Sequence, residues 1–291
     1  MPTAEEIIAG IPIWKGRIRI EPLSGGITNR NFLVTDTVQR AVVRLGEDIP
    51  VHHVSRSNEL AASLAAHAAG ISPAVLYHGP GVLILDYIEG RTLAPEDIRD
   101  PAVLERIVSL IKTCHRDIPA HLEGPVANFN AFQIIRDYAK TLQEGESRYC
   151  DRLRALLNSC KALESAAVPF GRVFGHNDLL AANFLDDGKK FWLIDWDYAG
   201  FNTPLFDLGG LASNNDVPED GERALLETYF DAAIDSALWK RYQAMKVASL
   251  LRETMWSMVS EIHSTLDFDY AGYTAENMAR FEGAFDEFRQ M

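Results

Sequence analysis

The pattern of hydrophobic and polar residues predicts a small sheet with one main helix in the first third of the chain. Three stretches alternate or are rich in Val and Phe, as strands are: RIRIEPL (17–23), RNFLVT (30–35) and RAVVRL (40–45). The alanine-rich stretch 55–70 predicts a helix that stops at Gly70. AVLYHG (74–79) and GVLILDYI (81–88) follow as a strand pair joined by a Gly-Pro-Gly turn.

From Ala94 onward the pattern becomes helical. The stretch 100–117 has Pro101 near its start and apolar residues three and four apart, which predicts an amphipathic helix. Further helices are predicted at about 130–143, 149–166, 219–233, 237–263 and 274–288. The layout is an α+β protein with an N-lobe over 1–89, a connector near Asp86–Gly90 and a larger, mainly helical C-lobe over 90–291. A cleft between two lobes is a common ligand site.

The stretch 173–200 interrupts the helices with short strands and turns, RVFG, NFLDD and FWLID, and with many polar residues. Asp178 and Asn183 lie five positions apart on one polar loop, and Asp195 ends a strand that reads as buried. The intervening residues predict a hairpin that turns at Asp187-Gly188, so Asn183 and Asp195 are expected to be neighbours, with Asp178 just beyond.

Composition and charge narrow the class of protein. The chain has 291 residues, of which 47% are hydrophobic and 24% charged, as in ordinary globular proteins. Acidic residues exceed basic ones by 41 − 28 = 13, which argues against a nucleic-acid partner or an anionic membrane surface and suits a cationic substrate. No apolar run approaches the roughly 20 residues that span a bilayer. The N-terminus lacks the features of a secretory signal, so a cytoplasmic location is expected.

The residue types at 173–200 point to phosphoryl transfer. Asp and Asn oxygens suit Mg²⁺, which usually takes one or two carboxylates together with phosphate oxygens. A further Asp outside the metal shell can accept the proton of an attacking hydroxyl. The alternative is that each residue merely forms a turn, as isolated Asp and Asn in loops usually do. The three cysteines include no CxxC pair, so neither a disulfide framework nor a structural zinc site is expected.

The polar residues of the stretch 173–200 resemble the motifs of a known family. His176-Asn177-Asp178 with Asn183, followed by Ile194-Asp195-Trp196, resembles the kinase-like phosphotransferases, and most of all the choline/ethanolamine kinases. The resemblance implies a two-lobed, protein-kinase-like fold. It makes Asp178 the catalytic base, Asn183 and Asp195 the Mg²⁺ ligands, and His176 a residue that shapes the catalytic loop. The segment FDLGG (206–210) resembles the family's FDIG segment, in which Asp207 would brace that loop.

The resemblance extends to the nucleotide site, where it implies that ATP binds. LSGGITNRNFLV (23–34) resembles the loop that covers the nucleotide, and glycines there would let backbone N–H groups approach phosphate. The loop residues expected to contact the nucleotide are Ser24, Gly25, Gly26, Thr28 and Asn29.

Arg44 lies at the position where choline kinases carry an arginine, and Glu59 fits the acid that pairs with this arginine. Asp86, Tyr87 and Ile88 fit the hinge whose backbone would meet adenine. Taken alone, Arg44 reads as an edge-strand surface charge and Glu59 as an exposed helical residue.

For the acceptor, the resemblance assigns Trp256 and Tyr273 to a choline box, with Tyr270 and Phe268 adding aromatic area. Trp256 also lies beside an apolar stripe, so the alternative is that it serves only for packing. The stripe consists of Val247, Leu251, Met255, Met258 and Ile262. Two departures weaken the assignment to choline: Val259 replaces a second aromatic residue, and Asn214 or Asn215 replaces an acid. Asp197 is a further candidate for charge near the acceptor or for a position near the metal.

The leading hypothesis is an ATP- and Mg²⁺-dependent kinase of choline or ethanolamine. One alternative is a sister kinase of an aminoglycoside, thiamine or another hydroxylated acceptor. Another is a non-catalytic pseudokinase, against which the presence of Asp178, Asn183 and Asp195 argues. A metal-dependent hydrolase would need more His ligands than the sequence places near these residues. Choline kinases are often dimeric, so a homodimer is an expectation, although no stretch of sequence displays an interface.

Overall fold

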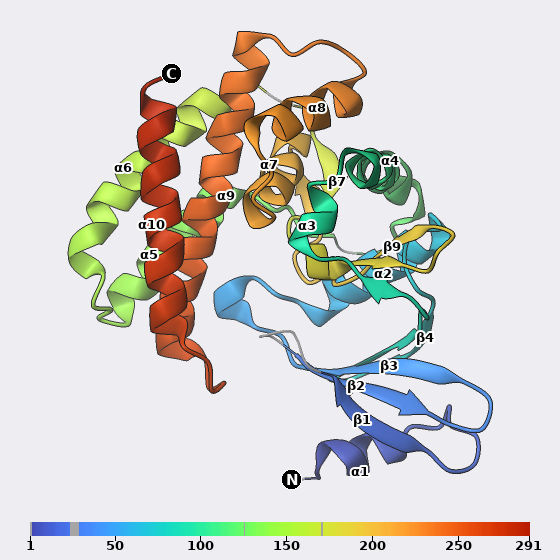
Figure 1. The fold of residues 1–291 in the computed structure, drawn as a ribbon. Coiled ribbons are helices and arrows are strands. Elements are labelled where there is room, and N and C mark those ends of the chain that lie inside the picture. Colours follow the sequence, from blue (N-terminus) through green and yellow to red (C-terminus); the bar gives the residue numbers. More distant parts are fainter. Residues whose placement is uncertain (1, 24–28, 125, 170) are drawn as a thin grey trace.

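A five-stranded antiparallel sheet forms the N-terminal lobe (Figure 1). The computed structural model describes residues 2–23, 29–124, 126–169 and 171–291. The strands are β1 (Arg19–Leu23), β2 (Arg30–Thr35), β3 (Arg40–Leu45), β4 (Val75–Gly79) and β5 (Val82–Asp86), in the order β1-β2-β3-β5-β4. β2 and β3 have the predicted bounds, and β4 pairs with β5 through the predicted Gly-Pro-Gly turn. β1 begins two residues later than predicted.

Two helices accompany the sheet. The predicted helix is α2 (Arg56–Ala68). The sequence pattern did not reveal α1 (Ala4–Ala9), whose six residues are too few to show a period. A capping box between Thr3 and Glu6 starts α1, and Ile8 joins one buried apolar cluster with Val34 and Val43 of the sheet.

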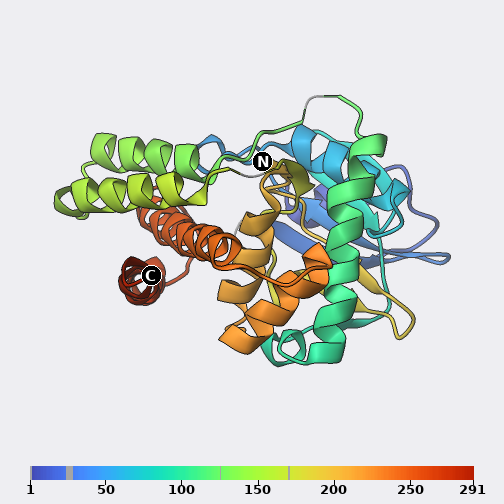
Figure 2. The ribbon, with the colours of Figure 1, turned by 90° about the horizontal axis from the view of Figure 1, so that it is seen from above.

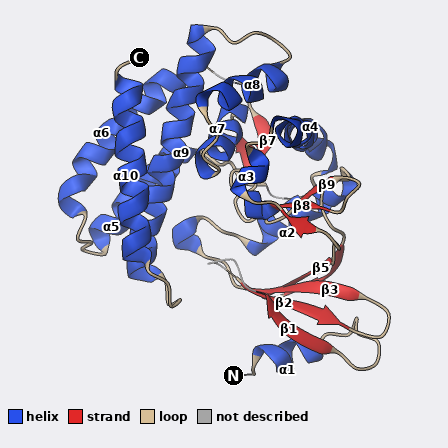
Figure 3. Cartoon of the chain, in the orientation of Figure 1, coloured by secondary structure: helices blue, strands red, loops and turns tan. Residues whose placement is uncertain are grey.

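The rest of the chain is mostly helical, as Figure 3 shows by colour. The α-helices are α3 (Pro95–Ile98), α4 (Pro101–Asp117), α5 (Ala131–Glu144), α6 (Cys150–Ala167), α7 (Pro204–Asn214), α8 (Glu219–Phe230), α9 (Ser236–His263) and α10 (Tyr270–Arg289). Short 3₁₀ helices are η1 (Pro50–His52), η2 (Ile118–His121) and η3 (Ala181–Asn183). Short strands are β6 (Arg91–Thr92), β7 (Val173–Gly175), β8 (Phe184–Asp186), β9 (Phe191–Leu193) and β10 (Gly200–Asn202). The fold class predicted from the sequence is confirmed, while the division at residue 89 stays a prediction.

Two helix boundaries differ from the predictions by three or four residues, and a further helix was missed. α8 ends at Phe230 because Asp231 adopts a left-handed conformation with φ 52°. α10 begins at Tyr270, four residues early, because the Asp269 carboxylate caps it by accepting from the Gly272 N–H at 2.9 Å. α7 was not predicted as a helix. Its Gly209 lets it approach α9 closely, since a Cβ there would lie 2.8 Å from Lys246 Cα.

The 28-residue helix α9 organises the helical lobe, because it contacts α5, α6, α7 and α10. Figure 2 shows the α5–α6 pair on one side of α9. The predicted apolar stripe is buried from Val247 to Met258, but Ile262 is 39% exposed because it lies in the last turn of the helix. Among the described residues, every helix is too short or too polar to cross a bilayer.

Candidate active site

A hairpin brings Asn183 and Asp195 together, as predicted. β8 and β9 pair antiparallel with Phe184 opposite Leu193, and the Ile194 N–H donates to the Asn183 carbonyl at 3.0 Å. The turn is fixed by the Asp187 carboxylate, which accepts from the backbone N–H groups of residues 189 and 190 at 2.8 Å each. The two candidate metal ligands therefore flank the open end of one short element.

Asp207 braces the loop that precedes this hairpin. Its carboxylate, 2% exposed, accepts from the backbone N–H of His176 at 2.8 Å and of Asn177 at 2.6 Å. His115 donates to it as well, from Nε2 at 2.9 Å. Burial opposes ionisation of Asp207, but the hydrogen bond and charge of His115 and the backbone donors hold its pKa below the usual value. The loop conformation includes a left-handed Asn177 with φ 65°, so Asp207 holds backbone that few residues adopt unaided.

His176 lies behind the candidate site. Its ring packs on Trp196 at a centroid distance of 4.8 Å, and Nε2 donates to the Ile194 carbonyl at 2.9 Å. Burial lowers the pKa of His176, which favours the neutral ring, and a neutral ring still carries the one N–H that the donation to Ile194 needs. His176 thus links the loop to the end of the hairpin, in keeping with the expected loop-shaping role, and its side chain is fully buried.

Arg44 joins three carboxylates from both lobes. Its Nε lies 3.0 Å from Glu59 Oε1, and its Nη2 lies 2.8 Å from Asp195 Oδ1 and 3.1 Å from Asp197 Oδ1. The side chains of Arg44 and Glu59 are only 8% and 3% exposed, and β3 lies between β2 and β5. The alternatives of an edge-strand charge and an exposed helical Glu are therefore wrong, and the expected pairing is present.

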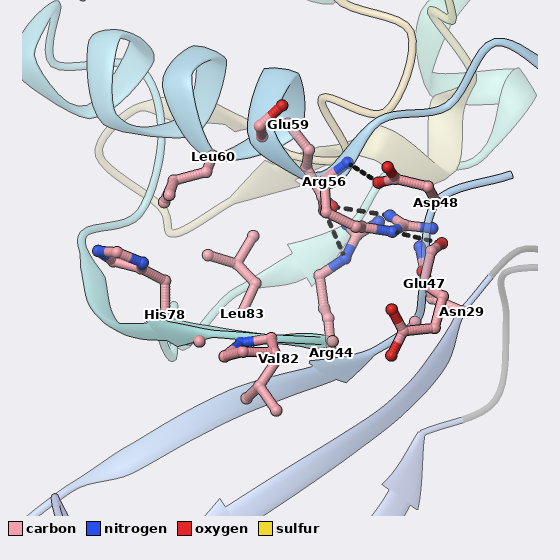
Figure 4. A pocket seen from close by; sticks show the side chains of 15 residues that line it. Asn29, Arg44, Glu47, Asp48, Arg56, Glu59, Leu60, His78, Val82 and Leu83 are labelled. Carbon is pink, nitrogen blue, oxygen red and sulfur yellow. Dashed lines mark hydrogen bonds and ion pairs between the residues drawn. The ribbon is translucent and has the colours of Figure 1, made fainter. Parts of the chain in front are cut away.

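Arg56 was not predicted to take part, yet it completes this charge cluster. Its Nη1 lies 2.7 Å from Glu59 Oε2 and 2.9 Å from Asp197 Oδ1. Figure 4 shows Arg44, Arg56 and Glu59 converging beside a cavity of about 310 Å³ between α2 and the sheet. Burial opposes ionisation of Asp197, but the two arginines hold its pKa below the usual value. Asn29 also donates to Asp197, at 3.1 Å. The Asp197 carboxylate therefore accepts hydrogen bonds from three residues of the N-terminal lobe.

Two further cavities meet at the end of the hairpin. The larger, of about 380 Å³, lies between the sheet and the hairpin. Its lining includes Arg44, the predicted hinge residues Asp86, Tyr87 and Ile88, and Ile194. The smaller, of about 170 Å³, lies on the side of the helices. Its lining includes Asp178, Asp197, Asn214, Trp256 and Tyr273. Ala182, Asn183 and Asp195 line both cavities.

Asp178 is half-buried in the wall of the smaller cavity. Burial raises its pKa to about 7, and the nearby Arg252 guanidinium opposes that rise. Its backbone carbonyl accepts from Asn183 Nδ2 at 2.9 Å, so the Asn183 amide oxygen points away from that carbonyl. The loop thus places a carboxyl group and an amide oxygen on neighbouring parts of one cavity wall.

The aromatic residues among the described lining of the smaller cavity are Tyr198, Trp256 and Tyr273, and the ring centroids of the last two lie 6.5 Å apart at 90°. Trp256 is both packed and part of the cavity: it is 4% exposed, and its Nε1 donates to the Tyr198 hydroxyl at 2.8 Å. Tyr270 packs on Trp256 at 6.2 Å, and Phe268 is 43% exposed.

The residues that depart from the family pattern have separate roles. Asn214 lines the cavity, whereas Asn215 is buried and donates to the Leu179 and Leu211 carbonyls at 3.3 and 2.7 Å. Val259 is fully buried. The predicted loop residues Ser24, Gly25, Gly26 and Thr28 lie outside the described residues.

Residues 19–245 match the family model APH, described as "Phosphotransferase enzyme family". The chain belongs to this family. The phosphotransferase is 26% identical over 294 residues to a "Probable ethanolamine kinase" of Arabidopsis thaliana, covering 87% of this chain and 76% of that protein. It resembles the crystal structure of a choline/ethanolamine kinase family protein from Mesorhizobium loti, with a TM-score of 0.77 and 28% identity over 97% of this chain and 94% of that one. The choline kinase LicA from Streptococcus pneumoniae shares the fold, with a TM-score of 0.76 and 22% identity over 92% and 94% of the two chains.

The resemblance to choline/ethanolamine kinases inferred from the sequence is thereby confirmed. The structure of the phosphotransferase adds residues that sequence reasoning missed, chiefly Arg56, Tyr198, Arg252 and Glu253. Spacing offered a signal for two of them. Arg56 precedes Glu59 by three residues, and Glu253 precedes Trp256 by three, so each lies one helical turn from a predicted site residue.

Proposed function

We propose that this phosphotransferase transfers the γ-phosphoryl group of ATP to the hydroxyl of a small amino alcohol, choline or ethanolamine. The observation that carries the proposal is the meeting of two cavities at Asn183 and Asp195, with Arg44 on one side and Asp178 on the other. A donor in the larger cavity and an acceptor in the smaller one would then meet at these residues. The grouping of Asp178, Asn183 and Asp195 also favours catalysis over a pseudokinase.

The larger cavity suits a nucleotide. Residues 86–88 line it, and in this proposal their backbone meets adenine, while Arg44, which also lines it, meets the phosphates. The Arg44 guanidinium offers a planar fork that matches phosphate oxygens, and Glu59 fixes it in place. In this proposal the glycine-containing loop predicted at Ser24–Thr28 covers the phosphates, an assignment that rests on the sequence alone.

Asn183 and Asp195 would hold Mg²⁺. The donor set fits this ion, because both side chains offer hard oxygens at the junction of the cavities, and Asp195 is 29% exposed. Within the described ranges no group of three His, Cys, Asp or Glu could bind an ion, which disfavours the hydrolase but suits Mg²⁺, whose remaining ligands are usually phosphate oxygens and waters. When bound, Mg²⁺ would neutralise charge on the phosphates.

Asp178 would act on the acceptor. The acceptor oxygen forms a bond to the γ-phosphorus, the bond from that phosphorus to ADP breaks, and the hydroxyl proton passes to the Asp178 carboxylate. A cavity of about 170 Å³ suits an acceptor of few atoms and is small for an aminoglycoside. The homodimer stays a prediction.

An acceptor screen tests the proposal. ADP release is measured with Mg²⁺ and ATP in the presence of choline, ethanolamine, thiamine or an aminoglycoside. We expect turnover with ethanolamine or choline that exceeds the rate with the other two by at least tenfold. Turnover of thiamine or an aminoglycoside alone, or of no acceptor, would contradict the proposed acceptor class.

Arg44→Lys should raise the KM for ATP by about 10- to 100-fold, since a lysine cannot form the forked contact and a charged hydrogen bond contributes roughly 1.5–3 kcal/mol. The KM of the acceptor should change little. Steady-state kinetics with each substrate varied measures both values. Arg19→Lys, at a β1 position whose side chain is 75% exposed, is the matched control. An unchanged KM for ATP in folded Arg44→Lys protein would remove Arg44 from the phosphate site.

A further inference from the structure

Glu253 places a carboxylate in the wall of the acceptor cavity. It belongs to α9, one turn before Trp256, and its side chain is 21% exposed. Oε1 accepts from the Tyr273 hydroxyl at 2.8 Å, and Oε2 accepts from Arg252 Nη1 at 2.7 Å. A carboxylate has about four acceptor positions, so these two bonds leave capacity for donors from a molecule in the cavity.

The neighbours of Glu253 hold it in one place. Arg252 is 4% exposed, and its guanidinium carbon lies 4.4 Å from the centre of the Tyr198 ring. The guanidinium is therefore held by stacking on Tyr198 as well as by its charge. Tyr273 is tied through its hydroxyl on the opposite side. A carboxylate held from two sides is preorganised for a ligand and loses little side-chain freedom when one binds.

The charge around the cavity favours a cation. Among the described residues that line it, the charged side chains are four carboxylates and one guanidinium: Asp178, Asp195, Asp197, Glu253 and Arg252. Asp195 and Asp197 are engaged by Arg44, whereas Asp178 faces the proposed hydroxyl. Glu253 pairs with Arg252, but it is the carboxylate that contacts Tyr273 on the aromatic side of the cavity, so it is the best placed to meet a positive charge at the far end of a short acceptor.

The acceptor cavity offers little aromatic surface compared with its four carboxylates. A quaternary ammonium has no N–H group and depends on aromatic faces. Trp256 and Tyr273 offer such faces in the described lining, while Tyr198 is already covered by Arg252. A primary ammonium carries three N–H donors, which match the remaining acceptor positions of Glu253.

We infer that Glu253 is the specificity-determining residue that selects an acceptor with an N–H-bearing ammonium, such as ethanolamine, over quaternary choline. The inference rests on the proposed function and narrows its acceptor. Arg252 and Tyr273 position the carboxylate.

The test compares kcat/KM for ethanolamine and its N-methyl, N,N-dimethyl and N,N,N-trimethyl derivatives, the last being choline. The wild-type value should fall along this series. Glu253→Gln should lower kcat/KM for ethanolamine by about 10- to 100-fold, as for loss of a charged hydrogen bond, and change the value for choline by much less. The series should then become nearly flat. Glu253→Asp keeps the charge and should retain part of the preference.

Glu261→Gln is the matched control. Glu261 lies on the same helix, accepts from the Tyr149 hydroxyl at 2.9 Å and pairs with Arg148 at 2.9 Å, so it repeats the Tyr and Arg partners outside the acceptor cavity. Its substitution should leave the preference unchanged. If Glu253→Gln does not fold, Glu253→Asp takes its place, and a preference for ethanolamine as large as in the wild type would count against the role of Glu253.

The outcomes separate the two proposals. Turnover of none of the four amino alcohols would refute the proposed function. Turnover with choline preferred by the wild type, or an equal loss on all four in Glu253→Gln, would refute the role of Glu253 and leave the kinase assignment standing.

Discussion

Asp178→Ala is expected to lower kcat by about 10²- to 10⁴-fold, the contribution typical of a general base. The affinity for ATP should survive, because Asp178 lines the smaller cavity and not the one assigned to the nucleotide. Rates of ADP release give kcat, and isothermal titration with Mg²⁺ and ATP gives the dissociation constant.

Asp178→Asn belongs in the same experiment, because it keeps the shape of the side chain and removes its basicity. Asp286→Asn serves as the control, since that carboxylate is 70% exposed on α10. Normal turnover by either Asp178 variant would show that another group accepts the proton, and the proposed division of roles would have to be abandoned.

Asp207→Ala should lower the free energy of unfolding by about 3–5 kcal/mol, the loss expected when one partner of a buried charged network is removed. The substitution leaves the backbone N–H groups of His176 and Asn177 and the His115 ring without their acceptor. Because these residues hold the loop that carries Asp178, kcat should fall as well. Urea denaturation followed by fluorescence measures the stability.

Asp36→Ala provides a comparison for Asp207. Asp36 also accepts from backbone N–H groups, those of Lys15, Val38 and Gln39, but it lies on an exposed turn where water can replace it. The decrease in the free energy of unfolding caused by Asp36→Ala should therefore be much smaller than that caused by Asp207→Ala. Equal effects of the two substitutions would mean that burial of Asp207 does not strengthen its role.

Local patterns predicted those parts of the molecule whose cause is local. The β-branched and aromatic residues of 30–35 and 40–45 specify strands, and Asp187-Gly188 specifies the turn that brings Asn183 to Asp195. α7 escaped prediction because two glycines lower its helix propensity, while the close approach of Gly209 to α9 makes a glycine necessary there.

The acceptor cavity was harder to predict. Apart from its spacing of three residues from Trp256, the sequence does not distinguish Glu253 from an ordinary helical glutamate, because its proposed role depends on Tyr273 of α10 and on the cavity beside Asp178. Asp197 likewise depends on distant partners: its contacts with Arg44, Arg56 and Asn29 span both lobes. Such roles arise from tertiary packing, which residue spacing alone does not report.

Because Asn183 and Asp195 terminate a single hairpin, the separation between them is set by local pairing and not by the relative orientation of the lobes. Arg44 comes from the sheet, so a rotation of one lobe against the other would move its guanidinium relative to the Asp195 carboxylate, while the hairpin backbone that spaces Asn183 and Asp195 would stay unchanged. Binding of the ion and binding of the phosphates are therefore linked across the two lobes through the Arg44–Asp195 contact.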